Sequence, residues 1–479
     1  MKKNNYDAII VGAGIGGLVC GCYLAKAGMK VLIVEKNPQP GGYCVSFKRR
    51  GCLFDAAVHA VQSCSRGSIL DIIFSELIKS NKLKFNRSDP TDTIIFRSGK
   101  LHIFNDQNKT INNFQNVFPT EKKSLQDFFN LLYSESLISL YFRYRRNTFL
   151  DVLNIFFKSE QLKAIFEVFL GNIGSFARKT SAVAAIVLIR QFIIDGGYYP
   201  EGGIQRIPDS LFEAFIGAGG NVILNKEVAK ILIKNKKCYG VRLKDGGSYF
   251  SKIVVSNCDF SRTIINLIGR QEADSRFLRK IENLETTYSN FVLYLTLDKQ
   301  YKKALDTGPG IWYVPNKRCL YSSKDADEAE SPDRGMFCSI SSKLDDSLMP
   351  SGQDIIRLMT STNHHGLSYW KDYNSMLSDR LVEQAKNIIP DVHKHIICKG
   401  HANSLLFEKY TWNKNGAVCG WMNTVENVNN PAHSNFESIK NLFFVGHWVT
   451  EKYGNGGVAM AASSGKKVAK AIILKRKSI

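Results

Sequence analysis

The chain has 479 residues, of which 44% are hydrophobic and 11% aromatic, so it can bury a large interior and is too long for one ordinary core. Its formal net charge is +21, but no helix-turn-helix, zinc-finger or RNA-binding pattern accompanies that charge, which argues against nucleic acid as a partner. The eleven cysteines are scattered without C-x-x-C pairs and predict reduced thiols rather than a disulfide framework.

The first stretch, residues 6–36, reads as a strand, a tight turn, a helix and a second strand. Its apolar run at 8–11 is short and rich in β-branched residues, as expected of a strand buried on both faces of a parallel sheet. Gly12, Gly14 and Gly17 then give the spacing G-x-G-x-x-G where this strand turns into the helix. The first glycine allows the turn, the second lets backbone approach a pyrophosphate, and the third lets helix and strand pack closely. The phosphates would sit on the helix N-terminus.

The second apolar run, Val31–Val34, ends in an acid, Glu35, at the spacing expected of a dinucleotide site. A carboxylate there can accept hydrogen bonds from the ribose hydroxyls. Because an acid disfavours a 2′-phosphate, the stretch predicts FAD or NAD rather than NADP, with Lys36 beside the ribose.

Residues 8–25 also lack charged side chains and follow two lysines, a pattern shared by signal peptides and membrane spans. Four glycines between residues 12 and 17 argue against both, and no small-x-small cleavage site precedes a clear mature start. We therefore expect a cytoplasmic protein.

A second glycine pair, Gly41 and Gly42, follows where a dinucleotide would continue toward its ring. Together with Glu35, an apolar-aromatic turn and the segment 54–59, this pair resembles the N-terminal signature of FAD-dependent phytoene desaturases, carotenoid isomerases and retinol saturases. These proteins form a branch of the amine-oxidase-like flavoprotein superfamily. The resemblance implies FAD as the cofactor.

The residue after the glycine pair is Tyr43, where many relatives in the wider superfamily have arginine. This is closer to the isomerase and saturase branch, and the resemblance implies that Gly42 and Tyr43 lie at the cofactor. His59 also resembles a histidine of that branch that lies near the flavin, and we take it as the candidate catalytic residue. The alternative is a histidine whose hydrogen bonds are satisfied within the core.

The stretch 93–104 reads as a hairpin, and residues 121–170 read as helices with wide apolar faces. Within the helices, Tyr141–Arg146 interleaves aromatic rings with three arginines. Such a segment can anchor a helix in the interface of an anionic bilayer, on the inner face of a membrane. The alternative is an amphipathic helix that faces its own core and exposes a basic outer face. The amphipathic helix is the commoner structure, whereas the net charge and a lipid-like substrate favour the membrane, and both readings stay open.

Residues 196–207, GGYYPEGGIQRI, resemble the family segment after which a helix re-enters the cofactor domain. Residues 221–224 and 228–233 read as strands, followed by a hairpin and a further strand within 236–259. In the relatives a valine gives its backbone groups to the adenine edge, and Val228 matches it.

Residues 286–300 alternate as a central strand of a second sheet, with 310–315 and 335–343 expected as its neighbours. The histidine pairs at 364–365 and 393–395 have no carboxylate or cysteine partner at ligand spacing. We therefore expect no metal site.

The last glycine-rich element, residues 441–472, reads as a buried strand, a turn at Gly446 and a helix of small residues. The resemblance implies that this element seats the ribityl chain and aims a helix N-terminus at the flavin C2 carbonyl, with Gly446, Gly457 and Val458 at the cofactor. Many flavoproteins have an acid after the first of these glycines, and this chain has His447.

These elements predict an α/β fold with a Rossmann-like FAD-binding domain and a discontinuous, mixed α+β substrate domain. The FAD-binding domain would comprise residues 1–85, 196–272 and 401–479. The substrate domain would comprise 86–195 and 273–400, with a helical part that can face a membrane.

The resemblance implies an FAD-dependent oxidoreductase that removes hydrogens from a long apolar isoprenoid, as in carotenoid desaturation. The combination of Tyr43 and His59 favours an alternative, a carotenoid cis-trans isomerase or a retinol-type saturase. Two further readings are an amine oxidase and a non-catalytic carrier of prenyl lipids. A carrier would have no need of the intact glycine motif and Glu35.

Overall fold

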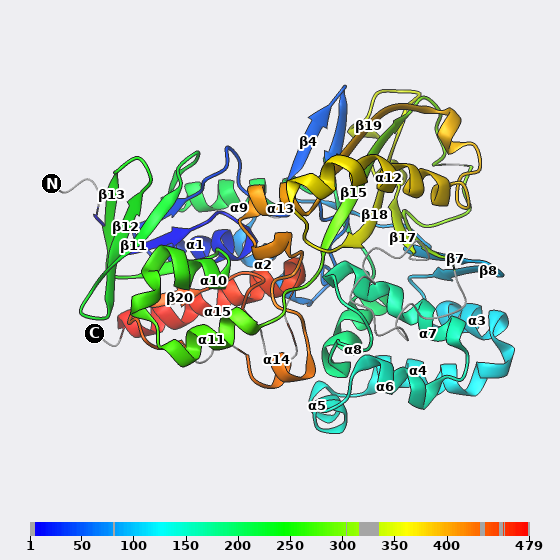
Figure 1. The fold of residues 1–479 in the computed structure, drawn as a ribbon, viewed down its shortest axis with the longest axis horizontal. Helices are drawn as coiled ribbons and strands as arrows, with labels where there is room; N and C mark the ends of the chain where they lie inside the picture. The colour runs from blue at the N-terminus through cyan, green and yellow to red at the C-terminus, as the bar shows by residue number, and fades with distance from the viewer. Residues whose placement is uncertain are drawn as a thin grey trace.

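In the computed structural model, two layered halves lie side by side, one built on a parallel sheet and the other on a larger mixed sheet (Figure 1). The structure describes residues 5–79, 82–302, 304–315, 335–431, 436–449, 454 and 456–477.

The parallel sheet has five strands in the order β10-β3-β2-β14-β20. The strands are β2 (Ala8–Val11), β3 (Val31–Val34), β10 (Asn221–Ile223), β14 (Val254–Ser256) and β20 (Leu442–Phe444). Both β2 and β3 are buried along their whole length, because layers of structure cover both faces of this sheet. Strands from three distant parts of the chain thus form one sheet, and the predicted Rossmann-like α/β class is confirmed.

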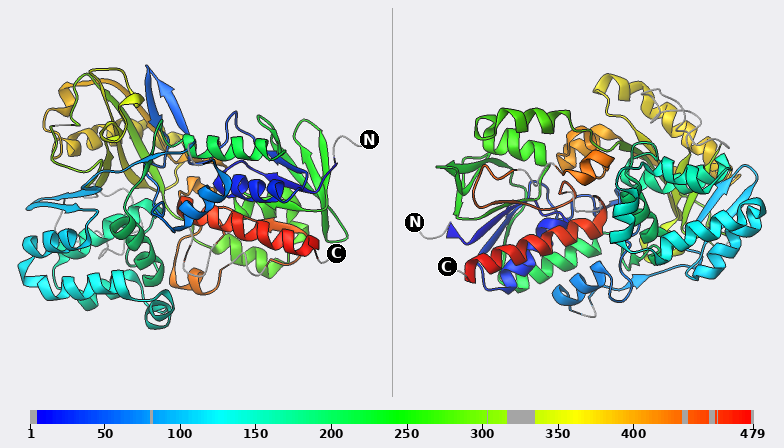
Figure 2. Two further views of the ribbon diagram at one scale, coloured as in Figure 1. Left: turned by 180° about the vertical axis from the view of Figure 1, so that it is seen from behind. Right: turned by 90° about the horizontal axis from the view of Figure 1, so that it is seen from below.

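Helices pack tightly on one face of this sheet. Helix α1 (Ile15–Lys26) lies along α15 (Gly457–Lys477), as the view from below shows, and it also contacts α9 (Arg206–Gly217) (Figure 2). A Cβ atom on Gly465 would stand 2.4 Å from the carbonyl oxygen of Gly16. The small residues of α15 therefore let the first and last helices of this half approach closely.

A second sheet and short helices cover the other face. This sheet has the order β1-β13-β12-β11, and its strands are β1 (Asn5–Tyr6), β11 (Val228–Lys234), β12 (Lys237–Leu243) and β13 (Ser248–Ser251). The helices are α10 (Phe260–Arg262), the π-helix Thr263–Gly269 and α11 (Ser275–Asn283). Alternate residues of β2 face opposite cores, Ala8 and Ile10 toward α1 and Ile9 and Val11 toward this layer.

The mixed sheet has seven strands in the order β19-β15-β18-β17-β16-β7-β8. They are β7 (Asp92–Phe96), β8 (Gly99–Ile103), β15 (Ser289–Leu297), β16 (Gly310–Val314), β17 (Met336–Ser339), β18 (Asp354–Thr362) and β19 (Ile396–Ala402). The predicted hairpin is the pair β7 and β8. The expected neighbours of β15 were wrong: β16 and β17 pair with each other, while β15 lies between β18 and β19. Each of the nine residues of β15 pairs with one of β18, a match between distant strands that local alternation cannot reveal.

A layer of helices lies below this sheet in Figure 1, and α12 (Leu367–Ala385) packs against β15, β17 and β18. The lower layer consists of α3 (Gln107–Val117), α4 (Lys122–Ser134), α5 (Leu137–Tyr144), α6 (Phe149–Phe156), α7 (Glu160–Glu167) and α8 (Ala182–Arg190). Its interior is a cluster of phenylalanine rings from α3, α4, α7 and the segment after α6. In the part of the chain that is described, no helix is long and apolar enough to cross a membrane.

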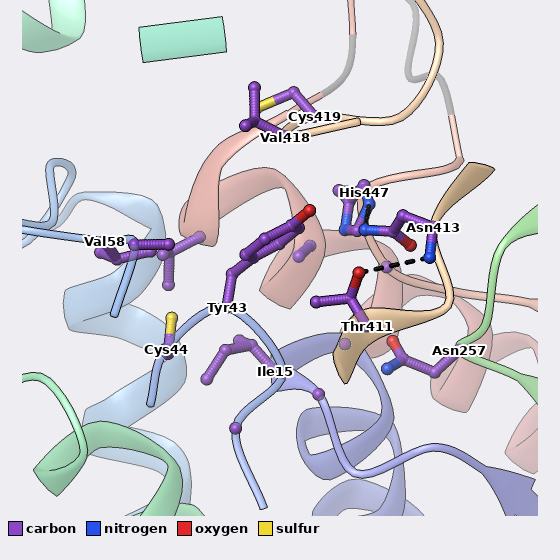
Figure 3. A pocket seen from close by; sticks show the side chains of 18 of the residues that line it. Ile15, Tyr43, Cys44, Val58, Asn257, Thr411, Asn413, Val418, Cys419 and His447 are labelled. Carbon is purple, nitrogen blue, oxygen red and sulfur yellow. Dashed lines mark hydrogen bonds between the residues drawn. The ribbon is translucent and has the colours of Figure 1, made fainter. Parts of the chain in front are cut away.

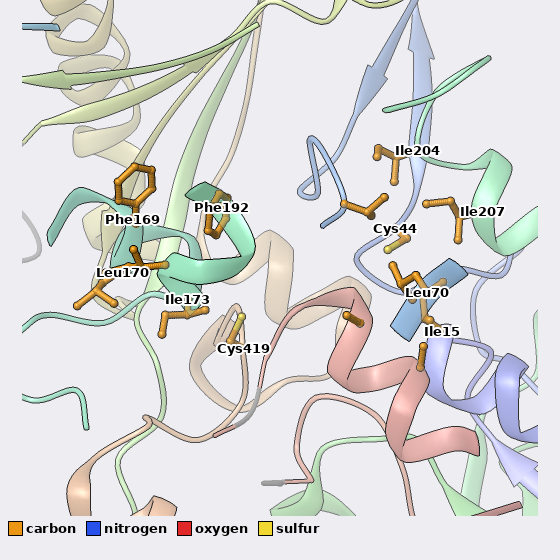
Figure 4. Close-up of a cluster of buried hydrophobic side chains, with 14 of the residues drawn as sticks. Ile15, Cys44, Leu70, Phe169, Leu170, Ile173, Phe192, Ile204, Ile207 and Cys419 are labelled. Atoms are coloured by element: carbon orange, nitrogen blue, oxygen red, sulfur yellow. The ribbon is translucent and has the colours of Figure 1, made fainter. Parts of the chain in front are cut away.

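Short elements complete the two halves. They are β4 (Ser46–Arg49), β5 (Cys52–Asp55), α2 (Ile69–Leu77), β6 (Phe85–Asn86), β9 (Tyr199–Pro200), α13 (Ser404–Thr411) and α14 (Val425–Asn429). The largest core cluster runs from α1 through the segments around Cys44 to Phe169 and Phe192 in the helical layer (Figure 4). The two halves therefore share one apolar interior.

Candidate cofactor and substrate site

One hollow of about 1730 Å³, partly open to solvent, is lined by residues of both halves. At one end it is lined by the carboxyl ends of β2 and β3 and by the N-termini of α1 and α15. At the other end it is lined by β15, β18 and the helical layer. Ligands of open α/β sheets bind at the carboxyl ends of the strands, so the first end is the place for a dinucleotide.

The glycine turn between β2 and α1 leaves no room for side chains. Gly12 has φ +98°, a conformation that favours glycine, and a Cβ atom on Gly17 would stand 2.3 Å from the carbonyl oxygen of Gly12. A Cβ atom on Gly16 would stand 2.7 Å from the backbone nitrogen of Gly446. The backbone segments therefore approach each other closely at the start of α1. The first N–H groups of the helix, apart from that of Gly17, can donate to an anion.

Asn257, which follows β14, holds this turn in place and was not predicted from the sequence. Its side-chain oxygen accepts a hydrogen bond from the Gly17 N–H at 3.0 Å, and its own N–H donates to the Val11 carbonyl at 2.9 Å. A Cβ atom on Gly14 would stand 2.6 Å from the Asn257 amide nitrogen. The signal for this residue is its position at the carboxyl end of the strand next to β2, which only the strand order reveals.

Glu35 is buried at the end of β3 and binds the neighbouring backbone. Its Oε2 accepts from the Ala13 N–H and its Oε1 from the Asn37 N–H, both at 2.8 Å. Burial raises the pKa of this carboxyl, and the two N–H donors oppose that shift. Since each carboxylate oxygen can accept a second hydrogen bond, both remain able to receive ribose hydroxyls.

Lys36 lies beside this carboxylate on the wall of the hollow. Its Nζ donates to the Lys409 carbonyl at 2.7 Å and lies 5.6 Å from the centre of the Trp412 ring. Burial lowers the pKa of this ammonium group. The end of α13 thus holds Lys36 in position near the ribose end.

Tyr43 stands in the middle of the hollow, between the dinucleotide end and the apolar end (Figure 3). Its hydroxyl donates to the Ala417 carbonyl at 2.9 Å, and its ring lies 5.9 Å from that of His447. Burial raises the pKa of the Tyr43 hydroxyl, which therefore stays protonated. A neutral aromatic side chain thus occupies the position where many relatives carry arginine.

His447 presents a neutral imidazole, because its neighbour Asn413 fixes the direction of the hydrogen bond between them. The indole N–H of Trp448 donates to Asn413 Oδ1 at 2.8 Å, which orients the amide. Asn413 Nδ2 therefore donates to His447 Nε2 at 3.2 Å. Burial lowers the pKa of His447 to about 4, in agreement with an accepting Nε2. Asn413 was not predicted from the sequence.

His59 lies on the wall of the apolar end. Its ring centre lies 4.2 Å from that of Phe337, and within the described ranges its side chain makes no hydrogen bond. Burial lowers its pKa well below the ordinary value, and nearby Arg357 acts in the same direction. Arg357 donates from Nη1 to the carbonyls of Asp55 and Ala57, just before His59 in the chain. His59 is thus a neutral ring that faces the hollow rather than a hydrogen-bonded core histidine.

The structure brings together all but one of the site residues predicted from the sequence. The residues that line the hollow are Gly12, Gly14, Glu35, Lys36, Gly42, Tyr43, His59, Val228, Gly446, Gly457 and Val458. Gly17 lies behind the wall, where it allows α1 to start close to the Gly12 carbonyl.

The apolar end is lined by Ile173, Leu188, Phe192, Met359 and Val418, together with the amide side chains of Gln62, Asn172, Gln191 and Asn290. Figure 4 shows Ile173 and Phe192 gathered near Cys419, opposite Ile15 and Cys44. None of these walls carries a predicted motif, because they come from separate segments that meet only after folding.

The whole arrangement fits a flavin dinucleotide. The glycine cradle and the helix N-terminus suit a pyrophosphate, Glu35 suits a ribose, and the remainder is wide and largely apolar. The described lining residues include charged groups only at the dinucleotide end. A bound flavin would supply hydride transfer at the junction of the two ends.

Comparison with known proteins agrees with this fit. The sequence profile of a family described as flavin containing amine oxidoreductase matches residues 15–473. Prolycopene isomerase 2, chloroplastic, of an Oncidium hybrid cultivar is 27% identical over 442 residues, which cover 83% of this chain and 72% of that protein. A 4,4′-diapophytoene desaturase (4,4′-diapolycopene-forming) of Methylomonas sp is 24% identical, over 92% of this chain and 91% of the other.

The fold is also similar to that of solved structures. An oxidoreductase from Methanosarcina mazei matches with a TM-score of 0.69 and 19% identity, over 97% of this chain and 99% of the other. At that identity the match concerns the fold alone.

Proposed function

The chain belongs to the flavin-containing amine oxidoreductase family, and from that membership we propose that it is an FAD-dependent oxidoreductase that removes hydrogens from a long apolar isoprenoid of carotenoid type. The observation that supports this reaction is the continuity of one hollow from a dinucleotide-binding end to an apolar end. Hydride chemistry on a polyene needs a dry cavity and little acid-base machinery. The relatives named for carotenoid substrates support the substrate class.

Within this proposal, the backbone at the start of α1 holds the pyrophosphate, Glu35 holds the ribose, and Val228 borders the adenine. Gly457 and Val458, at the N-terminus of α15, would hold the flavin ring, and the helix terminus would stabilise negative charge on the reduced ring. His59 and Tyr43 exclude water from the junction, since both are neutral and aromatic. The lining of the hollow supports these roles.

A second candidate is cis-trans isomerisation or saturation of the same kind of double bond. Tyr43 favours it, because the hydroxyl donates to a backbone carbonyl and no basic group occupies that position. An amine oxidase would need groups that bind an ammonium ion, and the described lining has no carboxylate at the apolar end. A lipid carrier would have no use for the glycine cradle.

We expect the purified flavoprotein to act on at least one of phytoene, a poly-cis-carotene and all-trans-retinol. Desaturation would bleach the visible flavin absorbance without oxygen, because hydrogens pass from the substrate to the flavin. Isomerisation would need a reduced flavin and give no net redox change, whereas saturation would consume the reduced flavin. Product analysis by chromatography under oxidising and reducing conditions separates the three. If none of these compounds is bound or converted, the polyene proposal is wrong.

The exposed surface of α5 and α6 supports peripheral contact with the anionic inner face of a membrane, from the cytoplasm. Ile138, Phe142 and Ile155 are each more than 60% exposed there. The Arg145 guanidinium lies 5.9 Å from the Phe142 ring, so basic and apolar groups share this surface. Helix α5 also packs on α8, whose Leu188 lines the hollow. The surface would therefore place an apolar substrate near its site.

Replacing Phe142 with serine should weaken binding to vesicles that contain phosphatidylserine by at least about tenfold, because a large apolar side chain contributes about 1.5–3 kcal/mol when it leaves water. Co-sedimentation measures the change. Ile216→Ser is the matched control, since Ile216 is 45% exposed on α9 in the other half. Equal losses in both variants, or no binding by the wild type, would contradict the contact.

A further inference from the structure

Four amide side chains interrupt the apolar end of the hollow: Gln62, Asn172, Gln191 and Asn290. They come from the loop after His59, the 3-10 helix Val168–Ile173, the π-helix Gln191–Asp195 and β15. Four separate segments thus bring polar groups to a wall that a hydrocarbon would not need.

These amides have hydrogen-bonding capacity to spare. The side chains of Gln62 and Gln191 make no hydrogen bond to any described residue. Asn172 uses one N–H, which donates to the Phe169 carbonyl at 3.3 Å.

Asn290 is the most buried of the four, at 6% exposed. Its Nδ2 donates to the Met359 sulfur at 3.1 Å, a weak acceptor, and its Oδ1 has no partner among the described residues. A buried amide without full partners costs free energy, and a ligand with a polar atom would recover part of that cost.

The polar group that suits this wall is neutral. The charged side chains of the described lining are Glu35, Lys36, Lys226 and Glu227, which follow β3 or precede β11 at the dinucleotide end. Among these described lining residues, neither a carboxylate nor an ammonium group would have a counter-ion at the apolar end. The Arg357 guanidinium is not part of this lining and donates to the backbone carbonyls of Asp55 and Ala57. Amides both donate and accept, which matches a hydroxyl group.

We propose that the substrate is an isoprenoid alcohol rather than a pure hydrocarbon, and that Gln191 and Asn290 determine this preference. The inference rests on the proposed function, because it assigns the apolar end to the substrate. The proposal restricts the substrates to polyenes that carry a neutral oxygen atom, such as a hydroxyl group. An amide-lined site rejects a ligand that lacks the oxygen, since its polar groups then stay unpaired.

A matched pair of ligands tests the proposal. All-trans-retinol and its deoxy analogue share one skeleton, and a methyl group replaces the CH2OH group in the analogue. Titration of the FAD-loaded protein, followed by the change in the flavin spectrum, should give at least about tenfold tighter binding of the alcohol. Geranylgeraniol and its hydrocarbon counterpart form a second pair of different shape. Equal affinity within both pairs overturns the proposal.

Gln191→Met is the decisive variant, because the wild-type side chain has no hydrogen bond to a described residue that could be lost. We expect the ratio of the two affinities to fall toward one, with flavin content unchanged. Asn290→Leu should act in the same direction. Gln107→Met, at the exposed start of α3, is the control and should keep the wild-type ratio.

The possible failures can be told apart. If the ratio stays at the wild-type value in both cavity variants, the assignment to Gln191 and Asn290 is wrong. If the FAD-loaded protein binds the alcohol and the hydrocarbon equally, the preference is wrong but the polyene function stands. If it binds no member of either pair and converts no carotenoid, both this inference and the proposed function are overturned.

Discussion

Glu35→Ala should yield a protein that loses FAD on purification, with an affinity at least about 100-fold below that of the wild type. The wild-type carboxylate accepts from the Ala13 and Asn37 N–H groups, and a hydrogen bond to a charged group contributes about 1.5–3 kcal/mol. Removing it frees the turn before α1 and also takes away the acceptors for the ribose. The ratio of flavin to protein absorbance gives the first measurement, and titration of the apoprotein with FAD gives the affinity.

Two further variants show whether the charge or the shape of the Glu35 side chain determines FAD affinity. Glu35→Gln keeps one acceptor oxygen and places an NH2 group against a backbone N–H, so we expect an intermediate loss of about tenfold. Glu201→Gln makes the same change at an exposed position and should retain full flavin content. Wild-type affinity in Glu35→Ala would show that the carboxylate does not bind the dinucleotide.

Gly17→Ala should reduce FAD affinity by about ten- to a hundredfold and destabilise the fold by about 1–3 kcal/mol. The new methyl group would stand 2.3 Å from the Gly12 carbonyl oxygen, which is backbone and cannot rotate away. The turn must therefore shift, and the hydrogen bond from the Gly17 N–H to Asn257 is strained or lost. Thermal unfolding and FAD titration measure the two effects.

Gly217→Ala is the matched control for this substitution. Gly217 is the last residue of α9, and a Cβ atom there would have no neighbour within 4 Å. Alanine is about 0.5–1 kcal/mol more favourable than glycine inside a helix, so this variant should be at least as stable as the wild type. If Gly17→Ala behaves like this control, the close contact at the turn does not limit FAD binding.

The sequence predicts the dinucleotide end well because that end is built from local chemistry. The glycine motif, β2, α1 and the acid Glu35 all lie within one continuous stretch. Glycines at this spacing indicate the tight backbone turn between the strand and the helix. The last strand and helix carry the same kind of signal. The family, the fold class and FAD as the cofactor follow from these elements, and the family match confirms them.

The rest of the site depends on which distant segments become neighbours. Asn257 supports Gly17 from 240 residues away because β14 lies next to β2. Asn413 sets the protonation state of His447 from a separate segment of the chain, and it belongs to no predicted motif. Gln191 and Asn290 are ordinary polar residues until the π-helix and β15 line one hollow. A one-dimensional pattern contains no information on these pairings.

The strand order of the parallel sheet also has a consequence for folding during synthesis. Its edge strand β20 pairs with β14 and comes only at residues 442–444, and α15, which packs along α1, follows it. During synthesis, β14 therefore keeps an unpaired edge and α1 an uncovered face until residues 442–477 have been made. Stable binding of FAD must therefore follow the synthesis of β20 and α15, because α15 covers α1 and its N-terminus lines the cofactor site.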